Sequence, residues 1–200
     1  VIGNENVRQT RVWSPADKKW LTSDLPVRLV HVDSEGNRHD AGVRFGILQK
    51  NGYASMLVRN DEEAGLWHFD GKQWVADPNG LAGLELDAPV FTCRKGQDQG
   101  VRLCDLDLDG TCELILGNPA QQAVFAWSAE GNGWRRLPFA LPEGTTIVDS
   151  QGRDAGLRLV DINGDRHLDV VFSNADRYLL QLYASMTEGW SKTVRSGKQA

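Results

Sequence analysis

The hydrophobic residues of this chain occur in short runs that are separated by turns rich in glycine, asparagine and aspartate. The runs are dominated by β-branched, leucine and aromatic residues, which favour strands. No window of 11 or more residues shows a convincing 3.6-residue period, the pattern of an amphipathic helix. The pattern therefore predicts an all-β protein.

The runs group into units of four predicted antiparallel strands. In the two clearest units the first strands are 101–106 and 157–162, the second 113–117 and 169–173, and the third 123–127 and 178–183. A turn at 130–133 precedes a fourth strand that opens at 134–139. Four-stranded units repeated around an axis are the blades of a β-propeller, so we predict this fold.

The same landmarks recur along the chain at a nearly constant interval. Three glycines that precede a predicted first strand are spaced 58 and 56 residues apart: Gly42, Gly100 and Gly156. An asparagine follows each glycine by 18 residues: Asn60, Asn118 and Asn174. Aromatic pairs seven residues apart come next, and the N-terminus carries a further pair: Trp67/Trp74, Trp127/Trp134, Tyr183/Trp190 and Trp13/Trp20. A repeat of about 57 residues is typical of stacked or radial architectures.

Acidic side chains are concentrated between the first and second predicted strands of two units. The nine-residue loops 105–113 and 161–169 carry them at positions one, three, five and nine, with one asparagine among them. Carboxylates this close repel one another unless a cation holds them, and Ca²⁺ takes six to eight oxygen ligands. The alternative is a solvated, aspartate-rich hairpin turn without an ion.

The pattern Asp-x-Asp-x-Asp-Gly-x-x-acid between two strands resembles the calcium loop of FG-GAP/VCBS repeats. Such repeats form the propeller blades of integrin α-subunits and of many secreted bacterial proteins. The resemblance covers nearly the whole chain and implies a partial propeller with two Ca²⁺ sites. Carried over residue by residue, it implies as ligands Asp105, Asp107, Asp109, the carbonyl of Thr111 and Glu113, and Asp161, Asn163, Asp165, the carbonyl of His167 and Asp169.

Two departures from the pattern carry information. Arg166 stands where the second loop should have a glycine, which places a side chain at a left-handed backbone position. In the first full unit the four aligned positions hold no carboxylate: Ile47, Gln49, Asn51 and Ser55. We expect no metal there and a simple Asn51-Gly52 turn. A position that works with or without metal indicates that the Ca²⁺ is structural.

These features divide one partial propeller domain, residues 1–200, into about 3.5 blades. We predict a partial blade and connector at 1–41 and a blade without a metal loop at 42–99. A blade with a calcium loop follows at 100–155, and an incomplete blade with a calcium loop at 156–200.

Three arginines occupy the start of each predicted first strand, four residues after an aspartate: Arg44, Arg102 and Arg158. They either line a central channel that meets anions or form ion pairs that fasten blade to blade, and the second alternative is favoured. The recurring aromatic pairs are either a sugar-stacking platform or structural wedges between blades, again with the structural alternative favoured.

Composition narrows the functional classes. The net charge of −5 without any basic run argues against nucleic-acid binding, and no apolar run reaches the roughly 20 residues of a membrane span. The three cysteines are too few for a disulfide framework. Cys104 and Cys112 are either free buried thiols or a disulfide across the first acidic loop, and Cys93 has no evident partner.

The sequence thus favours a calcium-stabilised binding or scaffold module outside the cytoplasm, where Ca²⁺ is millimolar. Its partner would be a protein or a polysaccharide, and further propeller blades in the same or another chain would complete the ring. The alternative is a non-catalytic or substrate-binding part of a larger secreted enzyme, such as a polysaccharide lyase or a haem-linked dehydrogenase. No catalytic constellation is visible in the chain itself.

Overall fold

The computed structural model describes residues 1–128 and 133–198, and within them the backbone forms strands and turns but no helix. The all-β prediction is therefore confirmed. Most of the turn predicted at 130–133 lies outside the described residues. None of the described segments is a helix long and apolar enough to cross a membrane.

Three four-stranded antiparallel sheets dominate the fold, and in each the spatial order of the strands follows the chain. The first contains β6 (Arg44–Gly46), β7 (Ser55–Arg59), β8 (Ala64–Phe69) and β9 (Trp74–Asp77). The second contains β12 (Val101–Cys104), β13 (Glu113–Gly117), β14 (Gln122–Ser128) and β15 (Gly133–Arg136). The third contains β16 (Leu157–Val160), β17 (Asp169–Ser173), β18 (Arg177–Leu182) and β19 (Lys192–Lys198).

Smaller elements precede and connect these sheets. A three-stranded sheet contains β1 (Ile2–Gly3), β2 (Arg8–Ser14) and β3 (Lys19–Asp24). Two hairpins are inserted in the connections between sheets. They are β4 (Val30–Val32) with β5 (Arg38–Asp40), and β10 (Cys93–Arg94) with β11 (Gln97–Asp98).

The last sheet corrects one expectation. We expected the unit at 156–200 to stop short of its outer strands, but β19 completes the sheet. The misjudged segment, Lys192–Lys198, is polar and largely exposed, so it lacks the hydrophobic signal of the other strands. Its strand character comes from pairing with β18 across a β-bulge at Leu180/Gln181.

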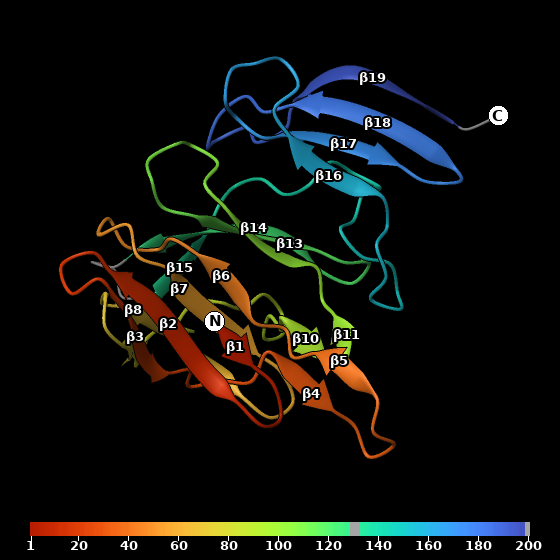
Figure 1. The fold of residues 1–200 in the computed structure, drawn as a ribbon. Coiled ribbons are helices and arrows are strands. Elements are labelled where there is room, and N and C mark those ends of the chain that lie inside the picture. Colours follow the sequence, from red (N-terminus) through yellow and green to blue (C-terminus); the bar gives the residue numbers. More distant parts are fainter. Residues whose placement is uncertain (129–132, 199–200) are drawn as a thin grey trace.

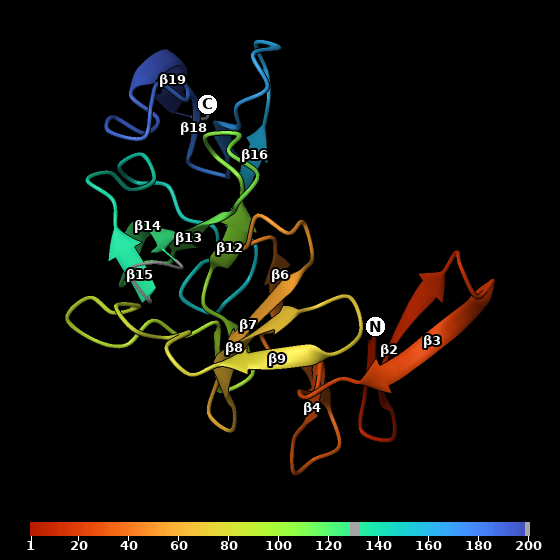
Figure 2. The ribbon, with the colours of Figure 1, turned by 90° about the vertical axis from the view of Figure 1, so that its left-hand side faces the viewer.

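The sheets follow one another along an open arc (Figures 1 and 2), with β1–β3 and β16–β19 at its two ends. Innermost strands β6 and β12 lie next to each other. The hydrophobic core consists of three clusters, one between each pair of successive sheets. Side chains alternate along β7 and so reach both neighbours. Met56 and Val58 pack in the cluster with Leu25 and Val27, which follow β3, whereas Leu57 packs toward the second four-stranded sheet.

Two tryptophans lock neighbouring sheets together. The indole N–H of Trp74 donates to the hydroxyl of Thr10 at 2.8 Å, and that of Trp134 donates to the carbonyl of Gly80 at 2.9 Å. Each bond runs from the outer strand of one sheet to the preceding unit. For Trp74 and Trp134 the geometry therefore supports a structural role between units instead of a sugar-stacking platform.

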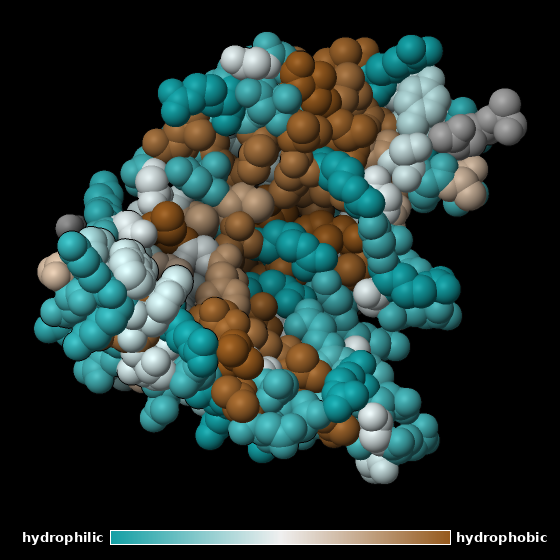
Figure 3. Space-filling model, in the orientation of Figure 1, coloured by the Kyte–Doolittle hydropathy of each residue, from teal (hydrophilic) through white to brown (hydrophobic). Residues whose placement is uncertain are grey.

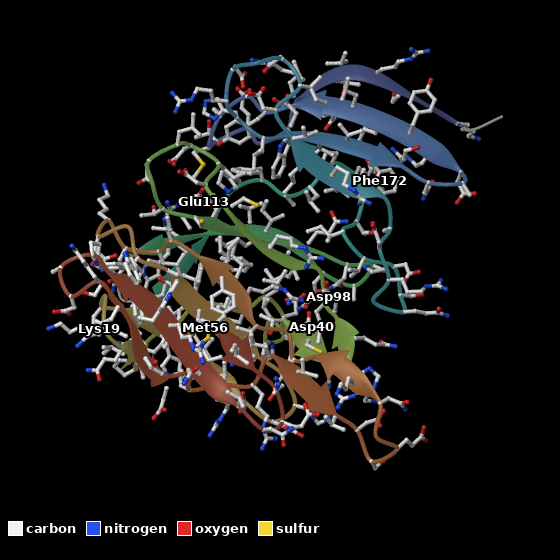
Figure 4. The ribbon with its side chains drawn as sticks, in the orientation of Figure 1. Lys19, Asp40, Met56, Asp98, Glu113 and Phe172 are labelled. Carbon is white, nitrogen blue, oxygen red and sulfur yellow. The ribbon has the colours of Figure 1, made fainter. Side chains whose placement is uncertain are left out.

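Arginine and aspartate side chains form a ladder of ion pairs along the innermost strands. Arg44 contacts Asp40 at 2.8 Å and reaches Asp98 of the next unit at 3.0 Å, while Asp98 also accepts Arg102 at 2.8 Å. Arg158 pairs with Asp154 of its own unit, at 2.6 Å. Figure 4 places Asp40 and Asp98 close together at the start of these strands. Arg44 therefore joins two units, as the favoured alternative predicted, whereas Arg102 and Arg158 pair with the aspartate four residues before them.

Replacing Arg44 by methionine is expected to destabilise the protein by about 2 kcal/mol, because Asp98 and Asp40 would lose a largely buried partner. The Arg44 side chain is only 13% exposed, whereas that of Arg158 is 62% exposed. The matched variant Arg158→Met should therefore leave the melting temperature unchanged. Equal losses in the two variants, measured by urea denaturation, would contradict a joining role for Arg44.

Candidate metal centre

The first acidic loop joins β12 to β13 and brings three aspartates together. Asp105, Asp107 and Asp109 each offer a carboxylate oxygen within 4.8 Å of the other two. Glu113, the fourth predicted side-chain ligand, begins β13 and is not part of that group. The loop thus gathers three of its four predicted side-chain ligands around one point.

Hydrogen bonds within the loop turn these carboxylates inward. Asp105 Oδ2 accepts the N–H of Gly110 at 3.1 Å, and Asp107 Oδ1 accepts that of Asp109 at 3.2 Å. Asp109 Oδ1 accepts both the N–H and the hydroxyl of Thr111, at 2.8 and 2.6 Å. These bonds fix the backbone around Thr111, whose carbonyl is the predicted fifth ligand.

One oxygen of the loop has no partner within the described residues. Asp105 Oδ1 is buried and accepts no hydrogen bond. A buried, unpaired carboxylate oxygen is costly, and a cation would remove that cost. The donor set consists of hard oxygens, which suits Ca²⁺ more than a softer metal.

The pKa of Glu113 also indicates an excess of negative charge in the first loop. Its side chain is buried, its Oε2 accepts the N–H of Leu106 at 2.9 Å, and Figure 4 shows it at the loop end of the sheet. The pKa of Glu113 is raised to about 7, chiefly by burial and also by the charges of Asp107 and Asp105, against the lowering effect of the Leu106 N–H. A divalent cation in the loop would favour the ionised form of this carboxyl.

The second acidic loop, between β16 and β17, repeats the backbone bonding pattern of the first. Asp161 accepts two backbone N–H groups, from Gly164 at 2.7 Å and Arg166 at 2.9 Å. Asn163 and Asp165 bond to each other at 2.8 Å, and Asp165 accepts the N–H of His167 at 2.9 Å. Asn163 stands at the position of Asp107, so the second loop has one carboxylate fewer than the first.

Asp169, predicted as the last ligand of the second loop, is fully buried and serves the backbone. Its Oδ1 accepts the N–H of Tyr183 at 2.9 Å and its Oδ2 that of Ile162 at 3.0 Å. The carboxylate thereby ties the loop to the end of β18. This structural task is compatible with metal binding, because each oxygen has a second lone pair.

The aligned position of the first full unit forms a turn that includes Asn51-Gly52. The turn at 49–52 is closed by a bond from the Gly52 N–H to the Gln49 carbonyl at 3.2 Å. Asn51 accepts the N–H of Tyr53 at 2.9 Å and donates to the Gln49 side chain at 3.1 Å. Ser55 bonds to His68 at 2.7 Å and so is committed to the sheet.

The second loop has Arg166 where the first has Gly110, and both residues adopt a left-handed backbone conformation. Gly110 has φ of +89° and the aligned Arg166 has φ of +76°, a region that disfavours residues with a Cβ. Arg166→Gly is therefore expected to stabilise the protein by about 1 kcal/mol, and Gly110→Ala to destabilise it by a similar amount. No atom lies within 4 Å of a Cβ built on Gly110, so steric overlap does not enter. Calorimetric melting measures both variants. A lower melting temperature in Arg166→Gly, or a higher one in Gly110→Ala, would contradict the strain argument.

The two acidic loops are in physical contact, which the sequence did not reveal. His167 of the second loop bonds through Nδ1 to the carbonyl of Leu106 in the first loop at 2.8 Å. The His167 ring stacks on Tyr183, with centroids 5.2 Å apart. The pKa of Tyr183 is raised to about 12, chiefly by burial and also by the charges of Glu113 and Asp107. Only the period of the repeat hinted at the contact, since it places equivalent loops side by side.

The cysteines are all free thiols. Burial raises the pKa of Cys104 to about 11, so this thiol is protonated and unreactive near neutral pH. The disulfide alternative for Cys104 and Cys112 is not what the structure contains.

No family model matches the chain, and the search of curated proteins finds none that matches it.

Proposed function

We propose that this chain is part of a calcium-stabilised β-propeller of the FG-GAP/VCBS type that acts as a binding or scaffold module outside the cytoplasm. The observation that carries the proposal is the cluster of Asp105, Asp107 and Asp109 with its buried, unpaired Asp105 oxygen. Two Ca²⁺ ions are proposed, one in loop 105–113 and one in loop 161–169. Binding of modest affinity suits the millimolar Ca²⁺ found outside cells.

The propeller part of the proposal rests on the repeated sheets. Three sheets share strand order, the register of their first three strands and a loop between their first two strands, and each packs face to face on the next. Radial repetition of such sheets protects their edges. The open arc in Figures 1 and 2 would become a ring if further sheets continued it.

The two ends of the arc support additional blades as partners. Val171 and Leu180 on the outer face of the last sheet are half-buried, whereas the equivalent Ile115 and Val124 are fully buried by the sheet that follows them. Figure 3 shows hydrophobic surface over this last sheet. At the other end Trp20 is 63% exposed, whereas the equivalent Trp134 is buried against its neighbour. Both faces are suited to further blades, in the same or another chain.

Isothermal titration calorimetry with Ca²⁺ tests the metal part of the proposal. The unmodified protein should bind two ions, and Asp105→Ala and Asp161→Ala should each leave one. Asn51→Ala, at the equivalent position without carboxylates, should leave both sites intact. Absence of binding at millimolar Ca²⁺ would refute the metal sites.

A further inference from the structure

A cavity of about 370 Å³ lies at the opposite end of the inner strands from the acidic loops. Its walls come from the β4–β5 hairpin, the 60–63 turn between β7 and β8, and the turn at 94–96 in the β10–β11 hairpin. Figure 1 shows the two hairpins beside each other, and Figure 4 places Asp40 far from Glu113. The volume falls within the range of small-ligand pockets.

The lining of this cavity is dominated by carboxylates. Five acidic residues contribute: Asp33, Asp40, Asp61, Glu62 and Glu63. Two permanently charged cations, Arg28 and Lys95, also line it. The carboxylates outnumber these cations, so the cavity attracts positive charge.

Most of these carboxylates already have a partner, but one oxygen of Glu63 has none among the described residues. Asp33 contacts His39 Nε2 at 2.9 Å, and Glu62 contacts His31 Nδ1 at 3.2 Å. Asp40 is held by Arg44. Glu63 Oε2 is buried and has no hydrogen-bond partner among the described residues.

The turn that carries Glu63 is held rigidly. Asn60 Oδ1 accepts the N–H groups of Glu62 and Glu63 at 2.8 and 2.7 Å, and Asn60 Nδ2 donates to the carbonyl of Ala41 at 2.8 Å. These bonds fix the acidic turn against the start of the inner strand. A binding group on a fixed turn loses little entropy when it meets a ligand.

Apolar surface completes the cavity. Val30, Ala41 and Cys93 line it together with the polar groups. Burial raises the pKa of Cys93 to about 11, so its thiol is neutral near pH 7. The wall therefore offers an uncharged strip beside the carboxylates.

We propose that this cavity binds the alkylammonium side chain of a lysine presented by a protein partner. The aliphatic stem would lie along Val30, Ala41 and Cys93, and the ammonium would pair with Glu63. The charged groups are spread around the wall instead of converging within 4.8 Å as the Asp105 group does, which fits an elongated organic cation better than a bare metal ion. This inference rests on the binding role proposed above and identifies the site and its ligand.

Amide chemical-shift perturbation with Nα-acetyl-lysine amide tests the site, in the presence of saturating Ca²⁺. The N–H signals of residues 60–63 and 95–96 should shift in a saturable manner, and the neutral norleucine analogue should leave them unchanged. Glu63→Gln keeps the side-chain shape and should weaken binding about tenfold. Glu143→Gln, an exposed glutamate that does not line the cavity, should bind as the unmodified protein does.

Three results would overturn the inference: no shifts in the folded protein, equal shifts with the norleucine analogue, or unchanged affinity in Glu63→Gln. The melting temperature of each variant shows whether it is folded. Failure here with two calorimetric Ca²⁺ sites intact would remove only the lysine site. Lysine binding without Ca²⁺ binding would instead remove the metal part of the proposed function.

Discussion

Adding about 10 mM Ca²⁺ to the metal-free protein is expected to raise its melting temperature by roughly 5–10 °C for each occupied loop. At a concentration one hundred times the dissociation constant, ligand binding stabilises the native state by about 2.7 kcal/mol. For a chain of this size each kcal/mol moves the midpoint by about 2–4 °C. Differential scanning calorimetry with and without EGTA measures the shift.

Two controls sharpen this experiment. Mg²⁺ demands a small octahedral site and keeps its waters, so equal concentrations should have a much smaller effect. Asp105→Ala should abolish the contribution of the first loop, whose unpaired oxygen it removes. An identical shift in Asp105→Ala and the unmodified protein would exclude the first loop as the site.

The pH dependence of the metal-free protein follows from Glu113. Its folded pKa of about 7 lies above the ordinary value of 4.5, so the folded state favours the protonated carboxyl. The metal-free protein should therefore lose stability as the pH rises from about 4.5 through 7. Ca²⁺ favours the ionised carboxylate, so the stabilisation by Ca²⁺ should be larger at pH 8 than at pH 5. A stabilisation that is independent of pH would argue against Glu113 as a ligand.

Asp169→Ala is expected to lower stability by about 3 kcal/mol even without metal, because one buried and one partly buried N–H group would lose their acceptor. These donors belong to Tyr183 and Ile162, and the carboxylate that serves them is fully buried. The melting temperature in EGTA should fall by about 6–12 °C. Asp176→Ala is a suitable control, since Asp176 is exposed.

The Asp169 variant separates two roles of the same residue. A large loss in EGTA demonstrates that the carboxylate fastens the loop to β18 irrespective of Ca²⁺. A variant that is unchanged in EGTA but no longer responds to Ca²⁺ would show that Asp169 acts only as a ligand. The geometry supports the first outcome.

The sequence predicted the sheets well because their signal is local. The period marked by Gly42, Gly100 and Gly156 places three four-stranded sheets correctly, since each strand carries its own apolar residues. Strand β19 was not predicted, because its residues are polar and gain their conformation from pairing with β18. Local patterns therefore found the strands with apolar faces and missed the exposed one.

Contacts between units are the part that the sequence could not supply. The Arg44–Asp98 pair was anticipated as one of two alternatives, and the distance of 3.0 Å decides for it. The contact of His167 with Leu106 depends on how two residues 61 positions apart meet in space. The cavity around Glu63 depends on how three connectors meet in space, so the repeat alone did not point to it.

A crystal structure of the protein grown with about 5 mM Ca²⁺ tests the central claim most directly. The account predicts a calcium ion about 2.3–2.6 Å from oxygens of Asp105, Asp107 and Asp109, with the Thr111 carbonyl and Glu113 completing the shell. Asp105 Oδ1, unpaired in the metal-free geometry, should be one of the ligands. A loop that stays free of calcium, with Asp105 bonded only to water or backbone, would contradict the account.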